Sequence, residues 1–176
     1  MAAIRARGAE VSIDDLAAAA GVSKPVLYDE FGGKLGVADA IAVVLAEQVE
    51  RAVIADLAKA QTLDMSLAVQ AVVDALVTLI VDEPQLYAFL VRSIRTSDRG
   101  FLDNALVRVI HERASLVMGL LAPGVPDAHL AVLTDGVFGF LFAAVESWQA
   151  TRTLEKDELV RVLTGVISGG FQALAT

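Results

Sequence analysis

The stretch SIDDLAAAAGVSKPVLYDEFGGK, which begins at Ser12 and ends at Lys34, decides the fold of this chain. Ser12 followed three residues later by Asp15 resembles a capping box in which Asp stands in for Glu, so a helix begins here. Gly21 ends that helix, because glycine adopts the left-handed conformation of a helix C-terminus at little cost. Ser23 is a preferred N-cap for a second helix. The stretch therefore predicts two short helices joined by a tight turn.

Two helices that cross over such a turn form a helix-turn-helix unit. The crossing needs a small residue at the contact, which is Ala17, a turn glycine four residues later, which is Gly21, and an apolar anchor six residues further, which is Leu27. Pro25 falls in the first turn of the second helix, where its missing N–H costs nothing. These residues stand in the register that the unit requires.

The second helix separates into two faces. Leu27 and Phe31 are four residues apart, and we expect both to point into the domain. The opposite face offers a donor, a hydroxyl and a carboxylate, as reading a major groove requires. Lys34 opens the next helix, where a cation beside free N–H groups suits a phosphate. The expected contacts to double-stranded DNA are Ser12, Ser23, Lys24, Pro25, Val26, Tyr28, Asp29 and Lys34.

With these residues at this spacing, the chain resembles the TetR family of bacterial transcriptional regulators. The family pattern "IA..AGVS..tlY.hF..K" is matched at Leu16-Ala17, Ala20-Gly21-Val22-Ser23, Leu27-Tyr28, Phe31 and Lys34. The remaining residues match as an all-helical pattern of the right length. The resemblance implies a homodimer with an N-terminal DNA-binding domain and a C-terminal domain that senses a ligand and dimerises.

Two features depart from the family pattern. Only Met1 to Arg7 precede the Gly8 turn, whereas family members usually begin with a full first helix and often a basic arm. We expect a native start further upstream, residues that the given sequence omits, or a shortened headpiece. Asp29 and Glu30 stand where the family often has neutral or basic residues. A carboxylate can accept from cytosine N4, so it adds specificity while it reduces attraction to phosphate.

The overall charge of −8 argues against DNA binding, but most of the negative charge lies outside the N-terminal headpiece. The first 34 residues hold four Lys or Arg and five Asp or Glu, so the headpiece is close to neutral. The local field is the one that meets DNA. Affinity then depends on oriented contacts and on a dimer.

A hydrophobic fraction of 56% and a mean hydropathy of +0.61 invite a membrane interpretation. The most apolar unbroken run, Gly136 to Val145, has ten residues, whereas a span needs about 20. No signal-peptide pattern is present. The chain has no cysteine, which excludes disulfides and thiolate metal sites. We therefore expect a cytoplasmic protein without a membrane partner.

The rest of the chain predicts helices throughout, so the fold class is all-α. We expect a helix-turn-helix DNA-binding domain over residues 1–38, with a shortened first helix, and a helical ligand-binding and dimerisation domain over residues 39–176. Apolar spacing and turn residues place the later helices at about 35–60, 65–81, 84–94, 101–121, 127–149 and 155–174.

The last two helices predict a dimer. Between Leu130 and Trp148 the apolar residues cover nearly the whole circumference, so the helix must be buried on two sides. A second subunit is one source of the outer cover, and the core of a monomer is the alternative. The expected interface residues are Leu130, Val137, Leu141, Val145, Leu159, Val166 and Gly169.

The chain carries no residue constellation of an enzyme, because no nucleophile stands with a base and no phosphate-binding glycine loop is present. His111 and His129 are the only histidines, and we expect neither a metal nor a cofactor. An apolar effector cavity is expected between the middle helices, although aromatic residues at this spacing also suit a plain core. Its candidate lining is Phe89, Arg92, Phe138, Phe142, Glu146 and Trp148.

The sequence thus predicts a homodimeric, ligand-responsive transcriptional repressor that a small, mainly apolar effector releases from a palindromic operator. The alternative is a helical dimer that binds a hydrophobic small molecule or a protein partner and has a degenerate headpiece. An upstream extension in the native gene favours the regulator.

Overall fold

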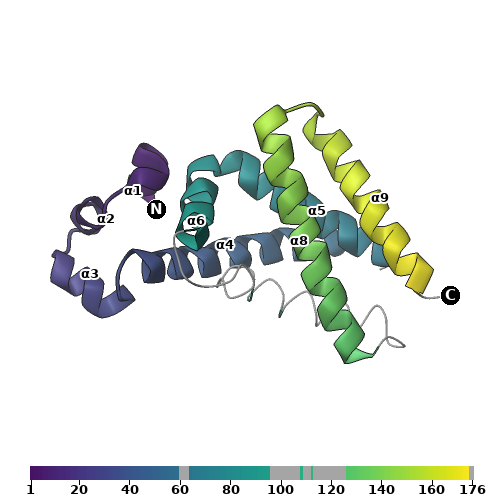
Figure 1. Cartoon of the computed structure of the whole chain (residues 1–176), viewed down its shortest axis with the longest axis horizontal. Helices are drawn as coiled ribbons and strands as arrows, with labels where there is room; N and C mark the ends of the chain where they lie inside the picture. The colour runs from purple at the N-terminus through teal and green to yellow at the C-terminus, as the bar shows by residue number, and fades with distance from the viewer. Residues whose placement is uncertain (60–63, 96–107, 109–111, 113–125, 175–176) are drawn as a thin grey trace. The chain divides into compact units, whose positions relative to one another are not determined.

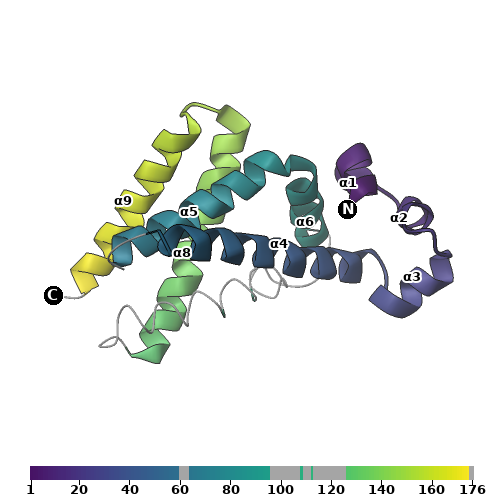
Figure 2. The same cartoon turned by 180° about the vertical axis from the view of Figure 1, so that it is seen from behind.

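The computed structural model describes residues 1–59, 64–95, 108, 112 and 126–174, and every regular element in these ranges is a helix (Figures 1 and 2). The all-α class is therefore confirmed. The elements are α1 (Ala2–Arg7), the 3-10 turn η1 (Gly8–Glu10), α2 (Ile13–Ala20), α3 (Lys24–Phe31), α4 (Lys34–Leu57), α5 (Met65–Asp82), α6 (Pro84–Arg95), α8 (Asp127–Thr151) and α9 (Lys156–Leu174).

The helices predicted from the sequence at 35–60, 65–81, 84–94, 127–149 and 155–174 are confirmed as α4, α5, α6, α8 and α9. Their ends differ from the predicted positions by at most three residues, close to the usual uncertainty of helix boundaries. The helix predicted at 101–121, together with His111, lies outside the described residues apart from Arg108 and Glu112.

The chain divides into two compact units. The first unit comprises Met1–Glu47 and Leu79–Val109, and the second comprises Gln48–Thr78 and Ile110–Thr176. The long helices α4 and α5 each contribute to both units. The domain boundary at residue 38 stays a prediction, and α6 shares a compact unit with the N-terminal helices.

The core of the first unit joins α6 to the N-terminal segment. Helix α6 packs against α1 and η1, and its Leu86 and Phe89 are fully buried, as is Ile4 of α1. The guanidinium of Arg5 donates two hydrogen bonds to one oxygen and one to the other oxygen of the Glu83 carboxylate, at 2.5 to 3.2 Å. These contacts fix α1 against the start of α6.

The core of the second unit is formed by the inner faces of α5, α8 and α9. Trp148 lies at the turn between α8 and α9, where its indole N–H donates to the carbonyl of Leu154 at 2.8 Å and Arg152 stacks on its ring. Lys156 at the start of α9 donates to Thr78 of α5 at 2.6 Å. The buried apolar residues include Val73, Leu76, Val77, Leu130, Phe138, Leu141, Val145, Leu163 and Ile167.

Helix α8 is more apolar along its length than the ten-residue run suggests. Among the described residues, Ala128–Thr151 is the one stretch long and apolar enough to cross a membrane by length and composition, with a mean hydropathy of 1.7. Only 33% of its most apolar window is buried within the chain. A helix that packs on its own chain along one side and on another protein surface along the other side is as apolar as a membrane-spanning helix.

Candidate nucleic-acid interface

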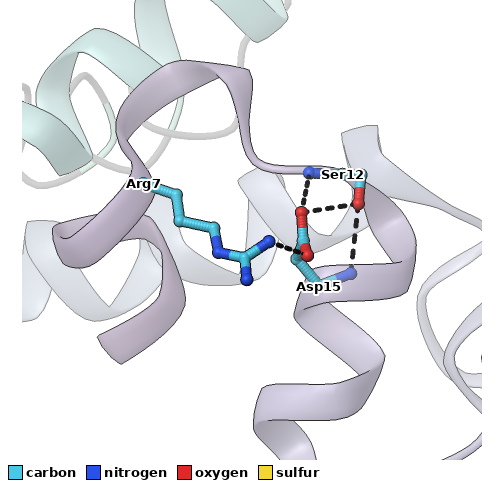
Figure 3. Close-up of polar contacts among 3 residues, drawn as sticks. All are labelled: Arg7, Ser12 and Asp15. Atoms are coloured by element: carbon cyan, nitrogen blue, oxygen red, sulfur yellow. Dashed lines mark hydrogen bonds and ion pairs between the residues drawn. The ribbon is translucent and has the colours of Figure 1, made fainter.

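The start of α2 is fixed by the predicted capping box (Figure 3). The hydroxyl of Ser12 accepts from the backbone N–H of Asp15 at 3.1 Å, and the Asp15 carboxylate accepts from the backbone N–H of Ser12 at 3.1 Å. The same hydroxyl donates to the carboxylate at 2.7 Å, and Arg7 of α1 pairs with its other oxygen. The hydrogen bond from the Ser12 side chain is the largest cause that lowers the pKa of Asp15.

We predict that the headpiece loses stability in acid partly through this box. A lowered folded pKa means that the ionised Asp15 stabilises the fold above its ordinary value of 3.8, and that this contribution is lost as pH falls through the folded value. Asp15→Asn should therefore lower the melting temperature at pH 6 and flatten its dependence on pH below about 4. Circular dichroism melts across pH 2 to 6 check this, and an unchanged pH profile in the variant would contradict it.

The turn between α2 and α3 has the geometry that its residues require. Gly21 has φ 69°, and its N–H donates to the carbonyl of Ala18, while the next N–H along the chain donates to that of Ala17. Ser23 occupies the N-cap of α3, although its hydroxyl makes no capping hydrogen bond. Ala17 and Leu27 are both buried, as the crossing of α2 and α3 requires. The predicted helix-turn-helix unit is therefore present.

One prediction about α3 is wrong. Phe31 was expected to point inward with Leu27, but its side chain is 41% exposed, whereas that of Leu27 is 4% exposed. Of the residues of α3, only Leu27 is buried. The four-residue spacing identifies a shared face of the helix, but it cannot show how far a neighbouring helix covers that face.

The opposite face of α3 is open to solvent. Val26 is 52% exposed and Tyr28 is 48% exposed, and Lys24, Pro25 and Asp29 are exposed beside them. Apolar, hydroxyl, cationic and carboxylate groups thus stand on one short helix, which is the mixture that base edges in a major groove can bind. Ser12 and Ser23, at the N-caps of α2 and α3, are exposed as well.

Lys24 connects the two helices of the unit. Its amine lies 3.0 Å from the carboxylate of Asp14 at the start of α2. Both side chains are exposed, and such surface pairs contribute only about 0 to 1 kcal/mol. The Lys24 amine can therefore leave Asp14 and bind a phosphate at a small cost in free energy.

Glycines at the junction of α3 and α4 position Tyr28. Gly33 has φ 119°, and a Cβ there would lie 3.2 Å from the Tyr28 ring, so the ring rests against the glycine. Gly36, in the first turn of α4, packs directly on the backbone carbonyl of Phe31. Any larger residue at Gly36 would overlap this carbonyl, so the close approach of the two helix ends depends on glycine.

Lys34 is held inside the first unit more than the sequence suggests. Its amine donates to the carbonyl of Ala9 at 3.3 Å and lies 5.4 Å from the centre of the Phe89 ring of α6. A lysine amine carries three N–H groups, so two remain for a phosphate. Lys34 therefore holds the start of α4 against η1 and α6, and its phosphate contact stays a prediction.

The six candidate effector residues do not form one group within either unit. Phe89 is buried in the first unit, where Arg92 pairs with Glu10 of η1. Phe138, Phe142 and Trp148 are buried in the second unit, and Glu146 is exposed there. Among the described residues, no three His, Asp or Glu side chains come together as a metal site, and His129 is exposed.

The single chain itself buries four of the predicted dimer-interface residues. Leu130, Leu141, Val145 and Leu159 pack in its own core and offer little surface to a partner, so their interface role stays a prediction. Val137 is half-buried, and Val166 and Gly169 are exposed. The apolar pattern predicts a helix that is covered on two sides, but periodicity does not say which side the chain itself covers.

Family models match nearly the whole chain. Residues 1–41 match the model described as bacterial regulatory proteins, tetR family, and residues 48–176 match the tetracyclin repressor-like C-terminal domain. Among solved structures, the chain is similar to a TetR family transcriptional regulator, PfmR, from Thermus thermophilus. That likeness has a TM-score of 0.55 and 22% identity over 89% of this chain and 87% of the other, and it shows the fold. No curated protein matches the chain.

Proposed function

The chain belongs to the tetR family of bacterial regulatory proteins, and from this premise we propose that it is a homodimeric repressor released from a palindromic operator by a small, mainly apolar effector. It is a DNA-binding transcriptional regulator and not an enzyme. The observation that carries the proposal is the solvent-exposed face of α3, which is held on α2 by a capped and glycine-terminated turn.

The proposed DNA contacts on α3 and at the start of α4 divide into two roles. Lys24 and Lys34 neutralise phosphates, and Val26 and Tyr28 contact base edges and sugar within the groove. Asp29 accepts from the N4 amine of a cytosine, which makes it the residue with the sharpest base preference. Because the chain as a whole is acidic, long-range attraction to DNA is weak and affinity rests on these oriented contacts in two headpieces.

Selection of bound sequences from a random duplex pool tests this proposal. A dimer with two recognition helices should enrich an inverted repeat whose half-sites lie about one helical turn apart. Failure to enrich any sequence at low salt would favour the alternative, in which the acidic Asp29 and Glu30 mark a headpiece that has lost DNA binding.

The exposed surfaces of α8 and α9 support the proposed dimer. Val132 and Phe140 on α8, and Val162 and Val166 on α9, are large apolar residues that solvent contacts in the single chain. The same two helices carry glycines at which an added Cβ would meet no neighbouring atom within 4 Å, and these permit close helix approach: Gly136, Gly139, Gly165, Gly169 and Gly170. Four helices, two from each chain, would cover this surface.

We predict that Val166→Glu converts the dimer into a monomer. Val166 is 56% exposed in the single chain, so the substitution leaves its core intact, but it buries a charge without a partner at the proposed interface. Light scattering at micromolar concentration measures the mass. Thr153→Glu in the exposed turn between α8 and α9 is the control and should remain a dimer. A monomeric mass for the unmodified chain would refute the proposed assembly.

We propose that the operator is released because effector binding and DNA binding are thermodynamically linked. An effector that binds one arrangement of the headpieces better than the other shifts the population toward it. If that arrangement spaces the two α3 helices wrongly for the operator, the effector weakens DNA binding, and operator weakens effector binding by the same factor.

A further inference from the structure

Four polar side chains are buried among the described residues, and all four are hydroxyls on helices: Ser93, Thr134, Thr164 and Ser168. Ser93 donates to the carbonyl of Phe89 at 2.8 Å, and Thr134 donates to that of Leu130 at 2.7 Å. Each thus uses the carbonyl four residues earlier in its own helix. Neither Thr164 nor Ser168 has any hydrogen-bond partner in the described structure.

Two buried hydroxyls without partners are costly, because folding removes them from water and returns no hydrogen bond. Such groups are rare in native proteins and call for a specific explanation. They are also adjacent, because residues four apart on a helix lie on the same face. A ligand group that hydrogen-bonds to both hydroxyls would explain why they stand on this buried face of α9.

The two hydroxyls lie on the inner face of α9. Leu163 and Ile167, which alternate with them, are buried at 3% and 5% exposure, whereas Gly165 and Val166 are exposed. The pair therefore faces the interior of the second unit, away from the proposed dimer surface. Helices α8 and α9 run in opposite directions across a short turn (Figure 1). The Trp148 hydrogen bond lies in that turn, before α9 begins, whereas Thr164 and Ser168 lie in the middle and second half of α9.

We propose that Thr164 and Ser168 are the polar anchor of the effector site, and that they bind one uncharged carbonyl or hydroxyl group of an otherwise apolar ligand. This inference rests on the proposed function and names the chemical class of its effector. A hydroxyl both donates and accepts, so either ligand group is suited. The described buried residues include no ionised group, so a charged ligand would lose its hydration without compensation.

The ligand-free protein supplies the first test. Thr164→Val and Ser168→Ala each remove a hydroxyl that lacks a partner, so each should raise the melting temperature. Thr134→Val is the matched control, because it removes a buried hydroxyl that is hydrogen-bonded, and its melting temperature should stay level or fall. Equal or lower melting temperatures for the two α9 variants would show that their hydroxyls are satisfied and would overturn the proposal.

Binding of defined probes supplies the second test. Calorimetry with 1-decanol, methyl decanoate and decanoate should give tighter binding of the two neutral probes. The double variant Thr164→Val and Ser168→Ala should bind the neutral probes about tenfold or more weakly, as expected when a hydrogen bond is lost from a buried site. Thr134→Val should bind them as the unmodified chain does.

In this binding experiment, any of three results would overturn the proposal: no binding of either neutral probe, unchanged affinity in the double variant, or preference for decanoate. Operator binding without probe separates this inference from the proposed function. The α9 variants should bind the selected duplex normally, so a failed anchor leaves DNA binding intact. If the unmodified chain binds no duplex, the proposed function itself fails.

Discussion

Gly36→Ala is expected to destabilise the first unit by about 1 to 3 kcal/mol and to reduce DNA binding with it, even though alanine is the better helix former. The reason is steric, because the new methyl group would overlap the backbone carbonyl of Phe31. Neither partner is the flexible end of a side chain, so α3 and α4 must separate. That movement displaces Tyr28, whose ring rests on Gly33 in the same junction.

Ala40→Gly, four residues further along α4, is the matched control. It should cost about 1 kcal/mol through helix propensity alone and leave DNA binding of the folded protein unchanged. Chemical denaturation gives both free energies of unfolding, and anisotropy with labelled duplex gives the affinities. A Gly36→Ala variant more stable than the unmodified chain would show that propensity decides at this position and would contradict the packing of the junction.

Tyr28→Ala is expected to weaken binding to every duplex sequence by about fivefold to 150-fold, as loss of about one to three kcal/mol of contact energy implies. The side chain is exposed and contacts Gly33, so its removal leaves the buried Leu27 anchor in place. The melting temperature should therefore change little while the affinity falls.

Two further variants separate the components of this contact. Tyr28→Phe keeps the ring on Gly33 and removes only the hydroxyl, so it should retain more affinity than alanine. Asp29→Ala should change the preference at one base position and leave the overall affinity similar or higher. Gel-shift titration against the selected duplex measures all three. Unchanged affinity in Tyr28→Ala would mean that this face of α3 does not enter the groove.

Local signals explain what could be predicted from the sequence. The capping box of Ser12 and Asp15 and the left-handed Gly21 depend on residues within a few positions, and the structure confirms both. The bounds of the long helices follow from proline, glycine and apolar spacing in the same way. None of these features requires knowledge of a distant segment.

Burial depends on distant segments, and here the sequence-based predictions were less accurate. Phe31 remains exposed because no described element covers it, whereas Leu141 and Val145 are buried within the single chain. The packing of α6 against α1 and η1 pairs Arg5 with Glu83, residues 78 positions apart. Periodicity along one helix carries no information on such pairings.

The predicted effector lining stays a prediction. Aromatic residues at helical spacing suit a cavity lining or a plain core, and the structure adds that the Trp148 indole donates to Leu154 in the turn between α8 and α9 and that Phe89 belongs to the other unit. Thr164 and Ser168, the anchor proposed above, are not among the residues that the sequence predicts for the effector site. Their signal in the sequence is two hydroxyls four residues apart within the apolar face of the last helix.

The mass of the complex between the chain and its selected duplex tests the central claim most directly. Light scattering on the purified complex should give two chains on one full inverted repeat, and a duplex with a single half-site should bind far more weakly. This result would join the α3 face, the α8 and α9 dimer and the palindromic operator in one measurement. One chain bound with equal affinity to the half-site and to the full repeat would contradict the account.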